Sequence, residues 1–381
     1  MNRFRFTRIL LIAVAILAVA YAMSPLYLRY ALLYQQPDLD DYTIFSNRVV
    51  MAGEYQPWSE SPGFGSKTIP QTYEKQFDKL KTVAFLVIKE EKIVFEKYWK
   101  GYSAESRFNS FSMAPSIVSL LIGAAVDEGY IKSVDQPAGD FIPAFRTGDK
   151  AKITIRHLLE MSSGLSWDES YSSLTSMTTK GYYGDDINSL VLEQAVVREP
   201  GIYFDYKSGN TQLLAIILAY ATGRNISTYA SEKLWIPMGA QGDALWSMDK
   251  ATGVEKAFCC FNANMRDFAR IGELALNRGR WFDRQLVSES YMNQAFAPSG
   301  QLIDSQSKLV SYYGWQWWLM NYRGYSVYYM MGLNGQYVIA VPELKMVIVR
   351  FGKKSSTELI RGIPADFFTW FDAGMELAGL R

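Results

Sequence analysis

The stretch from Phe108 to Ile131 reads FNSFSMAPSIVSLLIGAAVDEGYI, and it says more about the fold than any other part of the chain. Its second half, Ser116 to Gly129, is a long apolar run that ends in glycine. Such a run favours a buried helix over a strand. Ser112 stands just before this helix, where free backbone N–H groups and the positive end of the helix dipole would surround its hydroxyl. Taken alone, a serine here is most simply a helix N-cap, so any role in chemistry depends on the rest of the chain.

Working outward, strand patterns lie on both sides of this segment. The residues concerned are rich in β-branched and aromatic side chains, which is typical of strands. The predicted strands are Thr82–Ile88 and Ile93–Trp99, joined as a hairpin by KEEK, and Tyr325–Met331, Gln336–Val341 and Met346–Phe351. Residues from about 150 to 250 have a helical pattern, and Thr357–Leu377 predicts an amphipathic helix that closes the chain.

Strands near both ends with helices between them indicate an α+β fold, an antiparallel sheet flanked by helices with an inserted, mainly helical lobe. We expect a sheet lobe at about 81–145 and 255–381, and a helical lobe at about 146–254. A ligand cleft is expected where the two lobes meet. Residues 31–80 are rich in Pro, Gly, Ser and Tyr and are predicted to be an extended lead-in.

The composition excludes several classes of protein. Apolar residues make up 49% of the 381 residues and aromatics 15%, enough for a substantial core. The formal net charge is +1, so no nucleic-acid partner is expected. The string GFGSKT at 63–68 lacks the glycine directly before lysine that a phosphate-binding loop needs.

Cysteine and histidine are scarce. Cys259 and Cys260 are neighbours in sequence, and because adjacent residues rarely satisfy disulfide geometry we expect no disulfide. His157 is the single histidine, so a zinc site is not expected, and neither is any other cofactor. His157 is interpreted as structural, although a Ser–His hydrolase would have to use it.

The N-terminus has the pattern of an export signal. Residues 1–8 hold three arginines and no acidic residue, and Ile9–Met23 is an uncharged apolar run that continues through Leu28. We expect residues 1–30 to be a membrane anchor with the main domain exported to the periplasmic or extracellular side. A cleaved signal peptide is the alternative, because Ala20-Tyr21-Ala22 fits a cleavage site.

The quoted segment resembles the nucleophile region of β-lactamase-related serine hydrolases, of the class C β-lactamase and penicillin-binding-protein type. It is most similar to the branch of aminohexanoate-oligomer hydrolases and related esterases. That pattern is Ser-x-x-Lys at the start of a buried helix, with the lysine one turn up the same face. The resemblance implies that Ser112 is the nucleophile and that Pro115 occupies the lysine position. Proline is tolerated in a first helical turn but cannot be a base, and losing a positioned base costs roughly 10²- to 10⁴-fold in rate.

Two later segments resemble the other motifs of this family. In FDYKSGN (204–210), the resemblance assigns Tyr206 as an acid/base and Ser208 as its hydrogen-bonding neighbour. A tyrosine needs a nearby cation to ionise near neutral pH, and Lys207 is the candidate substitute for the missing lysine. In GLNGQ (332–336), it assigns substrate and oxyanion contacts, the latter from a backbone N–H near Leu333 or Asn334 together with that of Ser112. The set expected to surround the substrate here is Ser208, Leu333, Asn334 and Gly335. Met330 and Met331 replace the polar residues usual before this motif.

Other matches are interpreted as structural or as bordering the cleft. The stretches 153–165, 258–276 and 313–318 match family landmarks, and the tryptophans of the last are expected in the core. The loop from Trp167 to Asp186, which contains Tyr171, Tyr182 and Tyr183, is expected to border the cleft.

Three interpretations of the function remain open. The first is an exported, membrane-anchored serine hydrolase acting on a small ester or amide through an acyl-enzyme at Ser112, with an impaired or atypical base. The second is a catalytically inactive relative that binds a peptide or cell-wall-type ligand in the same cleft. Retained Ser112 and Tyr206 favour the first, whereas Pro115 and Met330 favour the second. A third reading is one altered copy of an otherwise active protein, which Pro115→Lys would repair.

Overall fold

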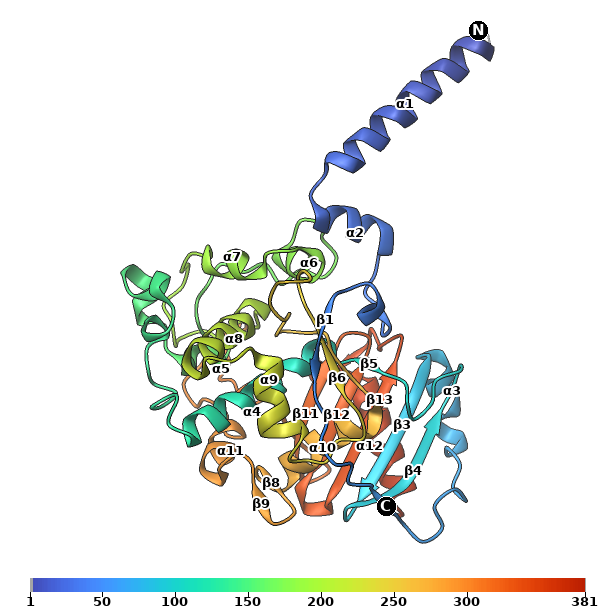
Figure 1. Ribbon diagram of the computed structural model, residues 1–381. Coiled ribbons are helices and arrows are strands. Elements are labelled where there is room, and N and C mark those ends of the chain that lie inside the picture. Colours follow the sequence, from blue (N-terminus) through green and yellow to red (C-terminus); the bar gives the residue numbers. More distant parts are fainter. Residues whose placement is uncertain (1–2, 381) are drawn as a thin grey trace.

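A computed structural model describes residues 3–380 as a rounded body with one helix projecting from it (Figure 1). That helix, α1 (Arg3–Met23), includes an 18-residue apolar window, Phe6–Met23, with mean hydropathy 2.2 and no part buried in the body. It is long and apolar enough to cross a membrane. The next helix, α2 (Leu26–Tyr34), packs against α6 (Met177–Tyr183) at the edge of the body.

A seven-stranded sheet forms one half of the body. Its order is β10-β11-β12-β13-β3-β4-β2, antiparallel throughout except for the parallel pair of β2 and β4. Strand β13 pairs with β3, with Ile348 opposite Val87, so the strands predicted near the two ends of the chain meet at the centre of the sheet. The bounds are β2 Ser59–Glu60, β3 Thr82–Lys89, β4 Lys92–Tyr98, β10 Trp318–Tyr322, β11 Tyr325–Gly332, β12 Gln336–Val341 and β13 Met346–Gly352. The α+β fold and the five predicted strands are confirmed.

This sheet is buried on both faces. Along β3, Leu86 and Ile88 belong to one hydrophobic cluster whereas Phe85 and Val87 belong to another, because alternate side chains point to opposite faces. The first cluster includes the predicted buried helix, α4 (Ala114–Asp127), with α8 (Ser208–Thr222) and α10 (Met265–Leu276). The second is covered by α3 (Gln71–Lys79) and α12 (Asp366–Leu377).

A smaller four-stranded sheet connects the N-terminal segment to the nucleophile region. Its order is β1-β6-β7-β5. The bounds are β1 Asn47–Val50, β5 Phe108–Asn109, β6 Ala244–Ser247 and β7 Phe261–Ala263. The segment at 31–80 is therefore more than an extended lead-in, because its apolar residues Leu39 and Val50 are completely buried and β1 extends the sheet.

The helices of residues 150–250 are short, apart from α8. They are α5 (Ile155–Leu159), α6, α7 (Ile187–Leu192), α8 and α9 (Ile226–Ala230). Later in the chain come the hairpin β8 (Arg280–Trp281) and β9 (Arg284–Gln285) and the helix α11 (Glu289–Ala295). The predicted helical character of residues 150–250 is thus present, with long connections between the helices.

Two expectations are wrong. The closing helix begins at Asp366 and not near Thr357, because Gly362 (φ 80°) and Pro364 belong to a hairpin of β14 (Leu359–Ile360) and β15 (Ile363–Pro364). Cys259 and Cys260 are joined by a disulfide although they are neighbours. Cys260 has a positive φ of 64°, and the turn that this creates brings the two side chains together.

Candidate active site

Ser112 lies in a tightly held turn between β5 and α4. The Ser110 N–H donates to the Phe261 carbonyl (2.9 Å), and the Phe261 N–H donates to the Ser110 hydroxyl (3.2 Å). Phe111 has a positive φ of 45°, and its N–H donates to the Asn109 side chain (3.0 Å). A left-handed phenylalanine is strained, and such strain persists only where the surroundings hold it. The turn therefore presents Ser112, in the short 3₁₀ helix Phe111–Met113, at a fixed place directly before α4.

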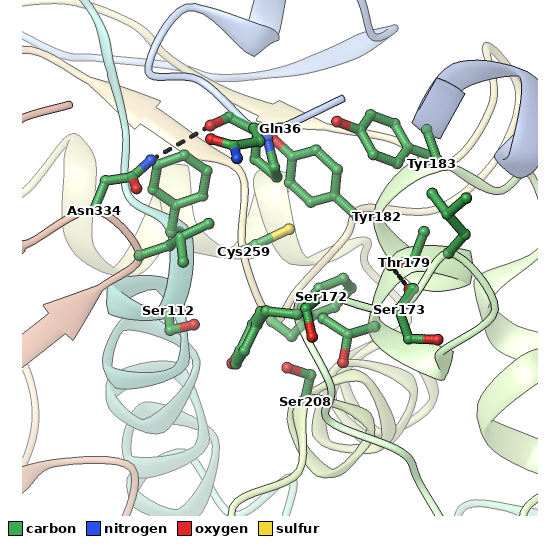
Figure 2. A pocket seen from close by; sticks show the side chains of 18 of the residues that line it. Gln36, Ser112, Ser172, Ser173, Thr179, Tyr182, Tyr183, Ser208, Cys259 and Asn334 are labelled. Carbon is green, nitrogen blue, oxygen red and sulfur yellow. Dashed lines mark hydrogen bonds between the residues drawn. The ribbon is translucent and has the colours of Figure 1, made fainter. Parts of the chain in front are cut away.

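A cavity of about 470 Å³ opens above Ser112 (Figure 2). Its walls include Ser112, Ser208, Leu333 and Asn334, so four of the residues predicted for the site share one cavity. None of the lining side chains among the described residues is charged. The volume is in the range of small-molecule sites.

Two other segments complete the walls of this cavity. The region from Trp167 to Asp186 contributes Tyr171, Tyr182 and Tyr183, which confirms that it borders the cleft. Ala31 of α2 and residues 35–37, directly after α2, also line the cavity. Asn334 donates weakly to the Pro37 carbonyl (3.4 Å), which ties the N-terminal segment to the motif at 332–336.

Tyr206 is held by aromatic rings with its hydroxyl toward Ser112. Its ring stacks on Trp318 (centroids 5.9 Å apart, planes at 17°) and meets Tyr313 edge-on (6.2 Å). The hydroxyl interacts with that of Ser112, yet it has no partner at full hydrogen-bond geometry among the described residues. Burial raises the pKa of Tyr206 above its usual value, and the nearby charge of Glu169 raises it further, whereas the Ser112 hydroxyl lowers it. Tyr206 is therefore a neutral phenol at neutral pH.

Lys207 is not available to ionise Tyr206, which corrects the expectation of a substitute cation. Its Nζ lies 2.9 Å from an Asp205 carboxylate oxygen and donates to the Trp167 carbonyl (2.9 Å). No lysine or arginine is among the groups that shift the pKa of Tyr206 in the described part of the chain. The side chain of Lys207 instead joins residues 205–207 to the segment at 167.

Glu169 is the residue that sequence reasoning missed. The Ser208 N–H (2.7 Å) and hydroxyl (2.6 Å) both donate to its carboxylate, and so does the Tyr171 hydroxyl (2.7 Å). The Tyr171 hydroxyl also interacts with Ser112. Burial raises the pKa of Glu169, while these hydrogen bonds oppose the rise. Nothing in the local string WDESY indicates this role, since the partners of Glu169 come from a different segment.

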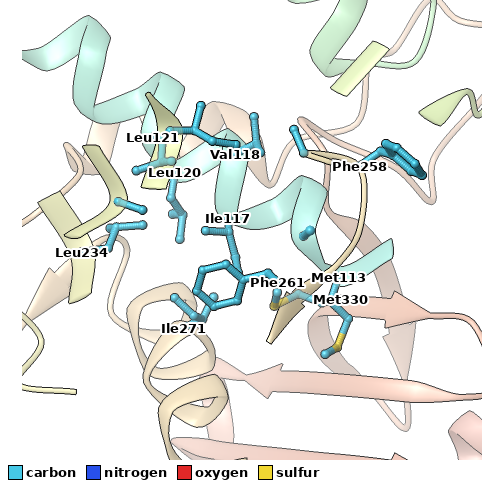
Figure 3. Packing of buried hydrophobic residues seen from close by; sticks show 14 of the residues in the cluster. Met113, Ile117, Val118, Leu120, Leu121, Leu234, Phe258, Phe261, Ile271 and Met330 are labelled. Carbon is cyan, nitrogen blue, oxygen red and sulfur yellow. The ribbon is translucent and has the colours of Figure 1, made fainter. Parts of the chain in front are cut away.

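Pro115 and Met330 are both part of the hydrophobic interior. Pro115 lies in the first turn of α4 and is buried. Met330, in the position where a polar residue is usual, is fully buried and belongs to the same cluster as Met113 (Figure 3). Neither position supplies a titratable group to the cavity.

The motif at 332–336 lies close to the nucleophile turn. Some of its residues line the cavity, and others pack against the rest of the protein. A Cβ added to Gly332 would lie 2.3 Å from the Ser110 carbonyl oxygen, so only glycine permits this approach. Leu333 and Asn334 line the cavity. Gly335 (φ 78°) instead packs against Arg350, which donates to its carbonyl (2.7 Å). The structure therefore brings Leu333 and Asn334, but not Gly335, to the cavity wall.

His157 is structural, as predicted, and of the three tryptophans of 313–318 that were expected in the core, Trp315 and Trp317 lie there whereas Trp318 is partly exposed and stacks on Tyr206. His157 forms a capping box with Thr154 at the start of α5. Burial lowers its pKa, which favours the neutral ring. Trp315 and Trp317 are 2% and 0% exposed and lie in the core.

This chain is similar in sequence and in fold to known hydrolases. The family model described as Beta-lactamase matches residues 71–362. A 6-aminohexanoate-dimer hydrolase from Paenarthrobacter ureafaciens is 26% identical over 293 residues, covering 73% of this chain and 74% of that protein. A solved structure from Bacillus anthracis, provisionally assigned as a 6-aminohexanoate-dimer hydrolase, superimposes with a TM-score of 0.77 at 22% identity, covering 93% of this chain and 95% of that one. A D-stereospecific amidohydrolase from a Streptomyces species does so with a TM-score of 0.58 at 14% identity, covering 77% and 93%.

Proposed function

The chain belongs to the beta-lactamase family, and from that premise we propose that it is a serine hydrolase that cleaves a small, uncharged ester or amide through an acyl-enzyme at Ser112. The observation that carries this proposal is the meeting of Ser112, Ser208 and Leu333 in one cavity, with the Tyr206 hydroxyl beside Ser112. These groups come from three separate segments of the chain, around positions 112, 206–208 and 333. A shared site of this composition supports acyl transfer.

The roles of the residues follow from where each group lies. The Ser112 hydroxyl attacks the carbonyl carbon, because Ser112 lines the cavity and hydrogen bonds hold its turn in place. The backbone N–H groups of Ser112 and Leu333 stabilise the oxyanion, and Gly332 permits their approach. Tyr206 is neutral, so it donates a hydrogen bond to the leaving group.

The uncharged lining limits the substrate. A buried carboxylate or ammonium group on a ligand is costly unless it is paired, and the described lining residues offer no charged partner. Hydroxyl groups, Asn334 and the aromatic rings suit a polar carbonyl flanked by apolar groups. The relative from Paenarthrobacter is named as a 6-aminohexanoate-dimer hydrolase, which is consistent with hydrolase chemistry in this cavity.

We also propose that α1 anchors the protein in the bilayer with the catalytic domain exported. The arginines at positions 3, 5 and 8 lie in the first turns of α1, before its uncharged run Ile9–Met23, which favours a cytoplasmic N-terminus. Residues 35–37, only a short distance after the span, form part of the cavity wall. The substrate site would therefore lie on the side of the domain nearest the membrane.

The second candidate is an inactive relative that binds a peptide or cell-wall-type ligand in this cavity. Pro115 favours it, because the position that holds the family's lysine cannot titrate here. The two candidates differ in one property: only a hydrolase forms a covalent intermediate at Ser112.

The deciding experiment uses the full chain in detergent and a short-chain chromogenic ester. We expect turnover by the native chain and an added acyl mass on the peptide that contains Ser112. Ser112→Ala should abolish both, whereas Ser172→Ala, which removes another hydroxyl from the same cavity, should retain both. Equal inactivity of the folded native and Ser112→Ala chains on esters and amides would favour the binding protein.

A further inference from the structure

We propose that Tyr171 and Glu169 form a proton relay that takes the place of the absent lysine, with Glu169 as the final acceptor of the Ser112 proton. The inference rests on the proposed function and names the base that function lacks. It would make this chain a family member that uses a carboxylate where Ser-x-x-Lys relatives use an amine.

The geometry supports a continuous path. The Tyr171 hydroxyl donates to Glu169 Oε1 (2.7 Å) at one end, and at the other it faces the Ser112 hydroxyl without a hydrogen bond at full geometry among the described residues. Ser112 and Tyr171 both line the cavity, and Ser208 lines it beside them. Glu169 is partly buried and is not among the residues that line the cavity, but it is hydrogen-bonded to two residues that do, Tyr171 and Ser208.

Glu169 is held rigidly for this task. Its two oxygens accept from the Ser208 N–H (2.7 Å) and the Ser208 hydroxyl (2.6 Å), at the first residue of α8. The start of this helix and three donated hydrogen bonds stabilise the ionised carboxylate. Burial acts in the opposite direction and raises the pKa of Glu169, which makes it a stronger base than an exposed glutamate.

Tyr206 is a poor alternative base for the same reason. The charge of Glu169 raises the pKa of Tyr206, so forming a second anion beside Glu169 is unfavourable. The neighbouring lysine, Lys207, is paired with Asp205. Tyr206 therefore stays neutral and serves as a hydrogen-bond donor to the leaving group, while Glu169 accepts and returns the proton.

Over one catalytic cycle, each proton that leaves one group is taken up by another, and each bond formed is matched by one broken. As Ser112 Oγ bonds to the carbonyl carbon, its proton passes to the Tyr171 oxygen and the Tyr171 proton passes to Glu169, so Tyr171 is neutral before and after. As the carbonyl re-forms and the bond to the leaving group breaks, the Glu169 proton returns through Tyr171 to the leaving group. Water then repeats the sequence: its proton goes to Glu169, its oxygen bonds to the acyl carbon, and the returning proton restores the Ser112 hydroxyl.

The test is the pH dependence of kcat/KM in the full chain with the chromogenic ester. The native profile should fall on the acidic side as Glu169 becomes protonated. Glu169→Gln keeps the size of the side chain but cannot accept a proton, so we expect a loss of about 10²- to 10⁴-fold and no acidic inflection. Tyr171→Phe should lose a similar factor, and because this side chain is 55% exposed, its folding should be unaffected.

Two matched controls separate the relay from a structural role. Asp168→Asn removes an adjacent, exposed carboxylate, and Tyr220→Phe removes an exposed phenol of α8 that does not line the cavity; both should keep the native profile. A Glu169→Gln chain that melts at a lower temperature yet retains the native acidic limb would overturn the relay. If Ser112→Ala is as active as the native chain, the proposed function fails first and the relay fails with it. Ser112-dependent turnover that is indifferent to Glu169→Gln and Tyr171→Phe overturns the relay alone.

Discussion

Replacing Gly332 with alanine should separate the effect of backbone geometry from that of side-chain chemistry at the site. An added Cβ would lie 2.3 Å from the Ser110 carbonyl oxygen, whereas ordinary contacts begin near 3.4 Å. The end of β11 and the turn before Ser112 must therefore separate by about 1 Å. A misplacement of about 1 Å in a catalytic site can cost roughly 10²-fold in rate. Overpacking of this kind also costs about 1 to 3 kcal/mol in the free energy of unfolding.

The assay is kcat/KM for the chromogenic ester, with the free energy of unfolding from denaturant titration of the same preparations. Gly300→Ala is the matched control, because a Cβ there has no neighbour within 4 Å and φ is not positive. We expect Gly332→Ala to lose about 10²-fold in kcat/KM and Gly300→Ala to lose nothing. If folded Gly332→Ala keeps native activity, the contact between β11 and the nucleophile turn does not position the reacting groups, and the oxyanion assignment fails.

Three further predictions concern stability, covalent structure and the N-terminal segment. Burial raises the pKa of Glu273 to about 7, so from pH 4.5 to 7 the unfolded chain releases a proton that the folded chain retains, and native stability falls by up to about 3 kcal/mol. Glu273→Gln should remove this fall. In denaturant titrations, the free energy of unfolding of the variant relative to that of the native chain should therefore be higher at pH 8 than at pH 5. Cys259 and Cys260 should resist alkylation in the unfolded chain until a reductant is added, after which mass spectrometry should find two groups; alkylation without reductant would contradict the disulfide. Deleting residues 1–24 should release the protein from the membrane fraction with unchanged kcat/KM, whereas deleting 1–37 removes part of the cavity wall and should raise KM. An unchanged KM in the longer deletion would show that residues 31–37 do not contact the substrate.

Much of the fold could be predicted because its signals are local. The hairpin of β3 and β4, the strands β11 to β13 and helix α4 agree with the predicted elements to within about two residues at each end. Each has a run of apolar or β-branched residues whose period matches its conformation. The closing helix was predicted too long because Gly362 and Pro364 interrupt a pattern that otherwise continues.

Part of the site could be predicted in the same way. Ser112, Ser208, Leu333 and Asn334 were each identified from a short motif, and all four line one cavity. Their catalytic roles remain proposals. Gly335 belongs to the same motif but packs against Arg350, because a three-residue turn after β11 points successive residues in different directions.

By itself, the sequence determined the α+β fold, the order of the motifs, the apolar N-terminal helix and the presence of Pro115 at the start of the buried helix. These depend on residues close together in the chain, where periodicity and residue type are enough. Only the tertiary structure decided that Glu169 faces Ser208 and Tyr171, that Lys207 is occupied by Asp205, and that the segment after α1 lines the cavity. The physical reason is that hydrogen bonds and charge pairs act over a few ångströms of space, and residues from distant segments come within that range only when the whole chain has packed.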